Sequence, residues 1–298
     1  MAKRRRKKGA RARPVVAPKV VAPKKKEPRS RRVWVGIAVM AVGVAVVAWG
    51  LRGRGGESVV EAERLRVRVV ARYPHQTDAF TQGLVWKDGV LYESTGGTGE
   101  SSLREVVLAT GEVVRMLNDE PALFAEGLAL VGDRLFQLTW RDGRALVYGA
   151  GDFAPVREHR YEGEGWGLCH DGKELVMSDG SDRLAFRDPE TFEVKRTVRV
   201  TLEGNPVMRL NELECVGGAV WANIWQEDRI VRVDADGRVT AVVDASGLLT
   251  AEERRGADVL NGIAWMPERG HFLLTGKRWP WMFEVDLEPE VRRRAGGR

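Results

Sequence analysis

A small set of polar, charged and aromatic side chains recurs at matched places along this 298-residue chain. Glu126 is an acid in an otherwise apolar run, and Lys277 ends another apolar run far downstream. The other members of the set are amides and tryptophans: Gln82, Asn211, Asn261, Trp140, Trp166 and Trp225. A glutamate can shuttle protons while a lysine and amides stabilise a developing oxyanion. Aromatic walls suit a cationic or amphiphilic small substrate.

Each of these residues also has a structural interpretation. An isolated tryptophan usually serves packing, and Asn or Gln at a strand end often forms a turn. Repeated units share the residues that serve structure, whereas these positions differ from one repeat to the next. That variation at a shared position favours a site.

Other common catalytic arrangements are missing from the sequence. There is no Ser-His-Asp or Cys-His arrangement and no Gly-rich phosphate loop. The four histidines are scattered, with no pair at metal-ligand spacing: His75, His159, His170 and His271. A zinc site built on histidine is therefore not expected.

Five stretches carry the candidate residues, and each reads as two apolar, alternating strands joined by a turn. They are residues 80–96, 123–140, 165–180, 210–225 and 260–277. Aligned, they define two columns. The first lies just before a Gly-Leu step, with Glu212 in the Gly place of the fourth stretch and Ile263 in the Leu place of the fifth, and the second lies at the end of the returning strand. The first column is Gln82, Glu126, Trp166, Asn211 and Asn261, and the second is Gly96, Trp140, Gly180, Trp225 and Lys277.

The repeats start about 40 to 50 residues apart, a period typical of propeller blades with four strands each. Five repeats predict an all-β fold, a five-bladed β-propeller. Inner strands of a propeller surround one axis, so both columns should meet at one mouth of the channel.

In each of the first four blades, two further segments are predicted to form the outer strands. In chain order they are 103–108 and 112–117, 145–149 and 155–160, 183–187 and 193–200, and 229–233 and 238–243. The last repeat has only three strands, at 259–265, 271–275 and 281–286. The alternating segment 65–72 is predicted to supply the fourth, which would close the ring and remove free sheet edges. A helical turn is expected over 250–256.

The N-terminus has a different composition. Residues 1–32 carry 15 Lys or Arg against one acid, so they cannot form a core and should be a disordered tail. Residues 33–51 are 19 residues without a charge, long enough to cross a membrane. The poor cleavage site that follows favours an uncleaved signal anchor over a cleaved signal peptide.

These features predict a single-pass membrane protein. The positive-inside rule places the tail in the cytoplasm and everything after the anchor outside, in the periplasm or extracellular space. The predicted parts are the tail (1–32), the anchor (33–51), a linker (52–64), the propeller (65–287) and a C-terminal tail (288–298). Nucleic acid is not expected as a partner, because the anchor explains the basic tail. A monomer is expected.

Two cysteines in an exported domain invite a disulfide. Cys169 lies two residues after its Gly, whereas Cys215 lies three after the equivalent position. On strands of period two these offsets point to opposite faces. We therefore expect two separately buried thiols.

The motifs FTQGL, FAEGL, QLTW, GWGL, LNELE, WANIWQ and DVLNGIAW…TGKRWP occur in that order over residues 73–286. In this respect the chain resembles the glutaminyl-peptide cyclotransferases of the plant and bacterial type, which are five-bladed propellers. The resemblance implies that an N-terminal glutamine of a peptide or protein closes on itself. Its α-amine attacks the side-chain amide, giving pyroglutamate and ammonia.

The resemblance also implies roles. The acid/base carboxylate falls on Glu126, and the other catalytic positions fall on Lys277, Asn211 and Gln82. Substrate-binding aromatics fall on Trp140, Trp166, Trp225, Phe80 and Phe124. No cofactor is required for catalysis, and no metal ligand is assigned. Family members can hold a structural divalent ion in the channel, with Asn261 as a neighbour.

Two other interpretations stay open. A non-catalytic exported propeller that binds peptide N-termini would need the aromatics but not Glu126. A metal-dependent propeller hydrolase would need acidic and amide ligands around the axis, for which Glu126, Asn211 and Asn261 are the candidates. An indole environment should raise the pKa of Glu126 while Lys277 opposes the rise, and the sequence leaves the balance open.

Overall fold

The computed structural model describes residues 61–290, and β-strands are the main secondary structure of this range. A short 3-10 helix, Glu253–Arg255, lies within the helical turn predicted over 250–256. The all-β prediction is therefore confirmed for the described range.

Several predicted parts lie outside the described residues. They are the basic tail (1–32), the membrane anchor (33–51), most of the linker (52–64) and most of the C-terminal tail (288–298). Within residues 61–290, no helix is long and apolar enough to cross a membrane.

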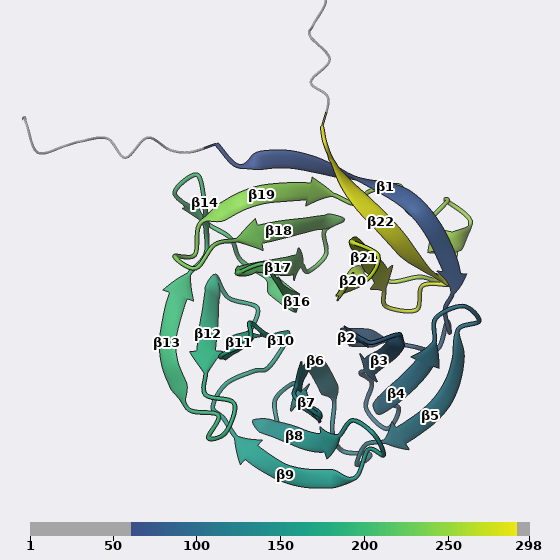
Figure 1. Cartoon of the computed structure of the whole chain (residues 1–298), viewed down its shortest axis with the longest axis vertical. Coiled ribbons are helices and arrows are strands. Elements are labelled where there is room, and N and C mark those ends of the chain that lie inside the picture. The colour runs from purple at the N-terminus through teal and green to yellow at the C-terminus, as the bar shows by residue number, and fades with distance from the viewer. Residues whose placement is uncertain (1–60, 291–298) are drawn as a thin grey trace, which may run out of the picture. The chain divides into compact units, whose positions relative to one another are not determined.

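The strands repeat one plan around a common centre (Figure 1). Repeats one to three are separate antiparallel sheets of four strands in chain order. Their strands are β2 (Thr81–Lys87), β3 (Val90–Thr95), β4 (Ser102–Val107) and β5 (Glu112–Asn118); β6 (Ala125–Val131), β7 (Arg134–Thr139), β8 (Arg144–Gly149) and β9 (Pro155–Arg160); and β10 (Leu168–His170), β11 (Leu175–Ser178), β12 (Arg183–Arg187) and β13 (Val194–Arg199). Each observed outer strand begins and ends within one residue of its prediction.

Repeats four and five belong to one eight-stranded sheet with the order β16-β17-β18-β19-β1-β22-β21-β20. The bounds are β16 (Leu210–Val216), β17 (Ala219–Ile224), β18 (Arg229–Val233), β19 (Val239–Asp244), β1 (Glu63–Pro74), β22 (Trp281–Pro289), β21 (His271–Gly276) and β20 (Leu260–Met266). A small hairpin that the sequence did not predict, β14 (Thr201–Leu202) with β15 (Asn205–Pro206), precedes repeat four.

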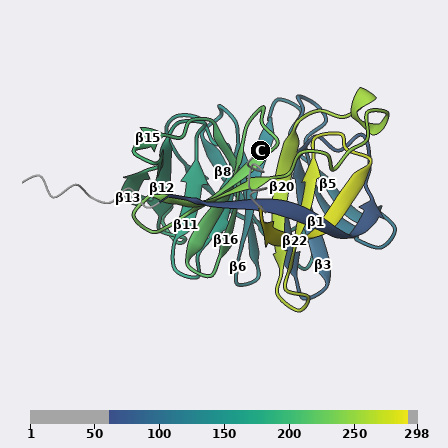
Figure 2. The same cartoon turned by 90° about the horizontal axis from the view of Figure 1, so that it is seen from above.

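Strand β1 joins the two ends of the described chain. It pairs antiparallel with β22, with Leu65 opposite Pro289 and Pro74 opposite Trp281. The prediction that 65–72 completes the last repeat is confirmed. β1 also runs parallel to β19 over a short stretch starting at Glu63, a pairing that the sequence did not predict. The view of Figure 2 shows β1 lying across the side of the strands.

The inner strands of every repeat except the third share a local irregularity. In β2, β6, β16 and β20 the pairing shifts by one residue between Thr81 and Gly83, Ala125 and Leu128, Leu210 and Leu213, and Leu260 and Ile263. Each shift falls at a first-column residue. A β-bulge bends its strand and redirects a side chain, so these bulges aim the first column away from the strand pairing.

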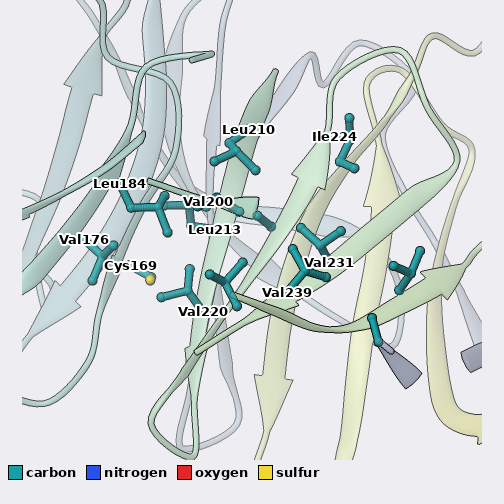
Figure 3. Packing of buried hydrophobic residues seen from close by; sticks show 14 of the residues in the cluster. Cys169, Val176, Leu184, Val200, Leu210, Leu213, Val220, Ile224, Val231 and Val239 are labelled. Atoms are coloured by element: carbon teal, nitrogen blue, oxygen red, sulfur yellow. The ribbon is translucent and has the colours of Figure 1, made fainter. Parts of the chain in front are cut away.

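Both faces of the sheets are buried because neighbouring repeats pack face to face. Figure 3 shows the cluster between repeats three and four, where Val176 and Leu184 meet Leu213 and Val220. The glycines of the Gly-Leu steps allow inner strands to approach. A Cβ at Gly167 would lie 2.0 Å from the Asn211 carbonyl oxygen, so no larger residue fits there.

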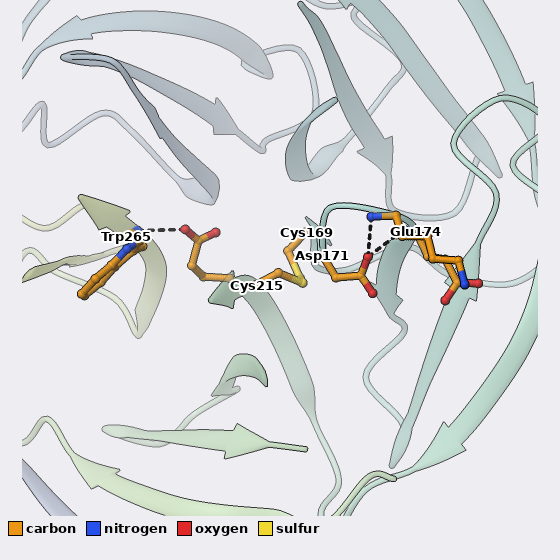
Figure 4. The surroundings of a disulfide bond; sticks show 7 residues. Cys169, Asp171, Glu174, Cys215 and Trp265 are labelled. Atoms are coloured by element: carbon orange, nitrogen blue, oxygen red, sulfur yellow. Dashed lines mark hydrogen bonds between the residues drawn. A yellow bond between two sulfur atoms is a disulfide. The ribbon is translucent and has the colours of Figure 1, made fainter. Parts of the chain in front are cut away.

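The prediction of two separate thiols is wrong. Cys169 and Cys215 form a disulfide with their Cα atoms 5.5 Å apart (Figure 4). The two cysteines lie on neighbouring repeats rather than on one strand. One face of a repeat packs against the opposite face of the next, so offsets that point to opposite faces bring the two sulfurs together.

Candidate active site

Three first-column side chains from three repeats form a hydrogen-bonded chain. Gln82 Nε2 donates to Glu126 Oε1 over 3.1 Å, and Asn261 Nδ2 donates to Gln82 Oε1 over 3.2 Å. Asn261 Nδ2 also donates to the Thr81 carbonyl oxygen over 2.9 Å. Gln82 and Glu126 are only 2% and 6% exposed. The amide chain therefore fixes one oxygen of a buried carboxyl group.

The environment of Glu126 raises its pKa well above the usual value for a carboxyl group. Burial is the main cause, because it disfavours the charged form. Lys277 lowers the pKa and Glu164 raises it, and both effects are smaller than that of burial. The balance that the sequence left open is thus decided by burial.

Lys277 is the cation of the site. Its side chain is buried, and Nζ lies 4.7 Å from the centroid of the Phe80 ring, within cation–π range. Burial lowers the pKa of Lys277, while Glu126 and Asp258 oppose that effect. The two buried groups, one acidic and one basic, therefore influence each other's protonation.

Aromatic side chains form two groups beside these polar groups. Phe124 contacts Phe80 edge-on at 6.1 Å between centroids and Trp140 at 5.6 Å. Trp166 meets Trp225 edge-on at 5.6 Å. Trp166, although a first-column residue, belongs to this aromatic part and not to the amide chain.

Glu164 links the two aromatic groups. Its Oε2 accepts the indole N–H of Trp140 over 2.8 Å and that of Trp166 over 3.0 Å. Its Oε1 accepts a bond from Arg141 Nε over 2.9 Å, and the Arg141 guanidinium lies 3.8 Å from the Trp140 ring centroid. The sequence prediction missed Glu164 because it lies in the connection before β10, outside both columns.

The two glycines of the second column make room for rings. A Cβ at Gly96 would lie 2.4 Å from Cε1 of Phe124, and one at Gly180 would lie 2.7 Å from Cζ2 of Trp166. Gly180 also has a φ of +80°, which other residues rarely adopt. The two glycines therefore leave space for rings that lie outside the second column.

Two amide oxygens of the first column have no protein partner within residues 61–290. Asn211 Oδ1 and Asn261 Oδ1 are both buried and accept no hydrogen bond. Buried acceptors without a donor are costly, so a ligand that carries N–H groups would satisfy them. Asn211 is not hydrogen-bonded to the side chains of the Gln82, Glu126 and Asn261 chain.

Two further carboxyl groups near the axis serve as links between strands. Glu212 accepts the N–H of Leu84 over 3.2 Å and that of Ile263 over 2.8 Å. Glu214 accepts the N–H of Trp265 over 2.8 Å, and burial raises its pKa to about 8. Glu212 ties β16 to β2 of repeat one and to β20 of repeat five, and Glu214 ties β16 to β20.

In the part of the chain that the structure describes, no group of three or more His, Cys, Asp or Glu residues could hold a metal ion. Asn261, the neighbour suggested for a channel ion, uses its amide nitrogen on Gln82 and Thr81.

Comparison with known proteins identifies the family. A sequence model of the glutamine cyclotransferase family matches residues 40–287. The chain belongs to the glutamine cyclotransferase family.

Two relatives of this glutamine cyclotransferase support the assignment. Over 248 residues the chain is 40% identical to a glutaminyl-peptide cyclotransferase of Arabidopsis thaliana, covering 81% of this chain and 77% of the plant protein. The crystal structure of Myxococcus xanthus glutaminyl cyclase superposes with a TM-score of 0.71 at 42% identity. That match covers 77% of this chain and all of the bacterial one. The resemblance drawn from the motifs is confirmed.

Proposed function

We propose that this glutamine cyclotransferase converts the N-terminal glutamine of peptides and proteins to pyroglutamate with release of ammonia. The observation that carries the proposal is the buried Glu126, held by Gln82 and coupled to Lys277, beside an aromatic wall. Family membership and both relatives support it.

Proton transfer is assigned to Glu126. The free α-amine of the substrate, whose usual pKa is about 7.7–8.0, attacks the side-chain amide carbon and forms the ring C–N bond. The Glu126 carboxylate takes a proton from the attacking nitrogen and returns it to the leaving nitrogen. The C–N bond of the amide then breaks, and ammonia leaves. The raised pKa suits a group that must both accept and donate.

The remaining side chains stabilise and hold the substrate. The ammonium of Lys277 stabilises the negative oxygen of the tetrahedral intermediate. Gln82 orients Glu126, because its N–H is directed at that carboxyl group. The free oxygen of Asn211 accepts a substrate N–H. Phe80, Phe124 and the three indoles enclose the aliphatic part and exclude water.

We place this chemistry on a five-bladed propeller, with β1 as the outer strand of the fifth blade. The common centre of β2, β6, β10, β16 and β20 in Figure 1 supports it. The scheme assigns every step to a side chain and requires no cofactor. A structural ion in the channel stays a prediction.

We also propose a membrane-anchored, single-pass monomer with residues 1–32 in the cytoplasm, 33–51 in the membrane and the segment before β1 as a tether. The strands from β1 to β22, residues 63–289, would then form the catalytic domain in the periplasm or extracellular space. The Cys169–Cys215 disulfide supports an oxidising compartment.

The two alternatives explain less of the site. A protein that only binds peptide N-termini has no need of a carboxyl group with a raised pKa beside a buried lysine. A metal-dependent hydrolase would draw on Glu126, Asn211 and Asn261, yet one carboxyl oxygen of Glu126 already accepts a bond from the Gln82 amide, and residues 61–290 offer no group of three or more His, Cys, Asp or Glu to complete a metal site.

The decisive test incubates the purified full-length protein, in detergent, with a Gln-initiated peptide. Mass spectrometry should show loss of one ammonia per peptide. The same peptide with an acetylated N-terminus should not react, because its nitrogen is no longer a nucleophile. Buffer alone measures spontaneous closure. Ammonia loss no faster than in buffer would rule out the proposed function.

A further inference from the structure

The bulges that aim the first column leave main-chain groups without strand partners, and neighbouring repeats supply the missing bonds. Ser94 Oγ of β3 donates to the carbonyl oxygen of Glu126 over 2.6 Å. Ser178 Oγ of β11 donates to the carbonyl oxygen of Asn211 over 2.7 Å. Asn223 Oδ1 of β17 accepts the N–H of Gly262 over 3.0 Å.

These three residues occupy one position of the repeat, two residues before the second column. The second repeat has Leu138 at this position, which cannot form such a bond. There the N–H of Gly127 donates to the carbonyl oxygen of Trp166 over 2.7 Å instead. Hydrogen bonds thus link the main chain at or beside the first-column residue of repeats two to five to the preceding repeat.

Ser94 is itself held in one orientation. Gln137 Nε2 of β7 donates to Ser94 Oγ over 3.0 Å. An amide N–H can only donate, so the single hydroxyl hydrogen of Ser94 is left for the Glu126 carbonyl. Gln137 Nε2 also lies 3.3 Å from Asp119 Oδ2. Ser94 and Gln137 are fully buried, so water cannot replace either of them.

We propose that Ser94, oriented by Gln137, is a positioning residue that fixes the Glu126 carboxyl group for proton transfer. The proposal rests on the proposed cyclotransferase function. Ser94 holds the main chain at Glu126, and Gln82 holds the far end of the same side chain. Without Ser94 the peptide unit at the bulge can rotate, and the carboxyl oxygen moves relative to substrate. Misplacement by about 1 Å can cost 10²-fold in rate.

A double-mutant cycle tests this role. Ser94→Ala should lower kcat about tenfold or more while KM changes little, because the hydroxyl does not touch substrate. In the Glu126→Gln background, Ser94→Ala should lower kcat by less than about twofold. The carboxyl group that Ser94 positions is then absent, so its misplacement no longer affects the rate. Equal losses in both backgrounds would mean that Ser94 is merely structural.

Ser178→Ala is the matched control. Ser178 is as buried as Ser94. Replacing it by alanine also removes a hydrogen bond from a hydroxyl to a main-chain carbonyl oxygen, here that of Asn211. Its effect on kcat should be the same with and without Glu126→Gln. Coupling of Ser178 to Glu126 as strong as that of Ser94 would contradict the proposal.

Gln137→Leu provides a second variant in case Ser94→Ala does not fold, which thermal unfolding would show. It removes the bond that orients Ser94 and should lower kcat in the same direction, with little further effect once Glu126 is Gln. An additive loss would again overturn the positioning role. Wild-type protein without ammonia release overturns the proposed function and this proposal together, whereas activity with additive losses overturns only the latter.

Discussion

At Glu126, burial and two flanking charges act on one carboxyl group in different directions. Burial raises the pKa, Lys277 lowers it and Glu164 raises it. The base form must be present for attack, so activity should fall as pH drops through this raised pKa. The acid limb of the rate profile should therefore lie above the ordinary titration range of glutamate, about pH 4.3.

Two charge-removing substitutions should move that acid limb in opposite directions. Lys277→Met removes the cation that lowers the pKa of Glu126, so the limb should move to higher pH, with a lower maximal rate. Glu164→Gln removes a negative charge but keeps an acceptor for the indoles, so the limb should move to lower pH. The pH dependence of kcat/KM measures both, and shifts in the same direction would contradict this account.

Replacing the carboxyl group itself should separate catalysis from folding. Glu126→Gln keeps shape and hydrogen bonding, yet should lower kcat by about 10²–10⁴-fold while KM changes less. Near-normal kcat would end the assignment and direct attention to Glu212 and Glu214.

The raised pKa of Glu126 also predicts how stable the Glu126→Gln variant should be, which provides a control for its folding. A folded pKa above the unfolded one gives stability that is present at low pH and lost as pH rises through the folded pKa. Removing that titration should leave the variant at least as stable as wild type at pH 8, measured by thermal unfolding.

The sequence predicted which side chains lie together better than it predicted their contacts. The columns placed Gln82, Glu126 and Asn261 at one mouth because equivalent strand ends meet around an axis. Whether an amide turns its nitrogen or its oxygen to a neighbour depends on side-chain geometry that no spacing encodes. Glu164 was missed because a connection has no periodicity from which to align it.

Among the elements, strand limits were predictable and the bulges were not. Alternating apolar residues and tight turns define where β4, β12 or β18 begins and ends. A bulge adds one residue to one strand. The sequences LNELE and FAEGL are equally compatible with a regular strand and with a bulged one, so they do not predict the bulge. Only the pairing register shows that all these strands shift at the first column.

The disulfide should contribute to stability between repeats three and four. Cys169 and Cys215 are separated by 46 residues, and closing a loop of that size typically stabilises by about 2–4 kcal/mol. The variant Cys169→Ala/Cys215→Ala should lose about that free energy in urea unfolding. Wild type under strong reductant should show a similar loss, and unchanged stability in both would refute the estimate.

If β1 closes the ring, two N-terminal deletions should differ in their effect on solubility and activity. Deleting 65–72 exposes the edges of β19 and β22 at once, so the protein should aggregate or unfold. Deleting residues 1–55 should leave a soluble, active enzyme. Sedimentation and ammonia release compare the two, and equal behaviour would exclude a closing role for β1.

For the whole molecule, the orientation in the membrane can be tested at the far terminus. The 15 basic residues before the predicted anchor should hold the tail inside. A reporter that works only outside the cytoplasm should therefore be active when fused after Arg298. A fusion that is active only in the cytoplasm would reverse the proposed orientation.

The place of β1 between β19 and β22 has a consequence for synthesis. Arg66 of β1 and its partner Glu288 of β22 are 222 positions apart, so β1 cannot pair with β22 until the whole described range has been synthesised. A prematurely terminated chain lacks β22 and leaves β1 with a bare edge, open to proteases and to pairing with other chains. Closure of the ring thus requires that synthesis has passed β22, and a chain that stops earlier keeps an unpaired edge on β1.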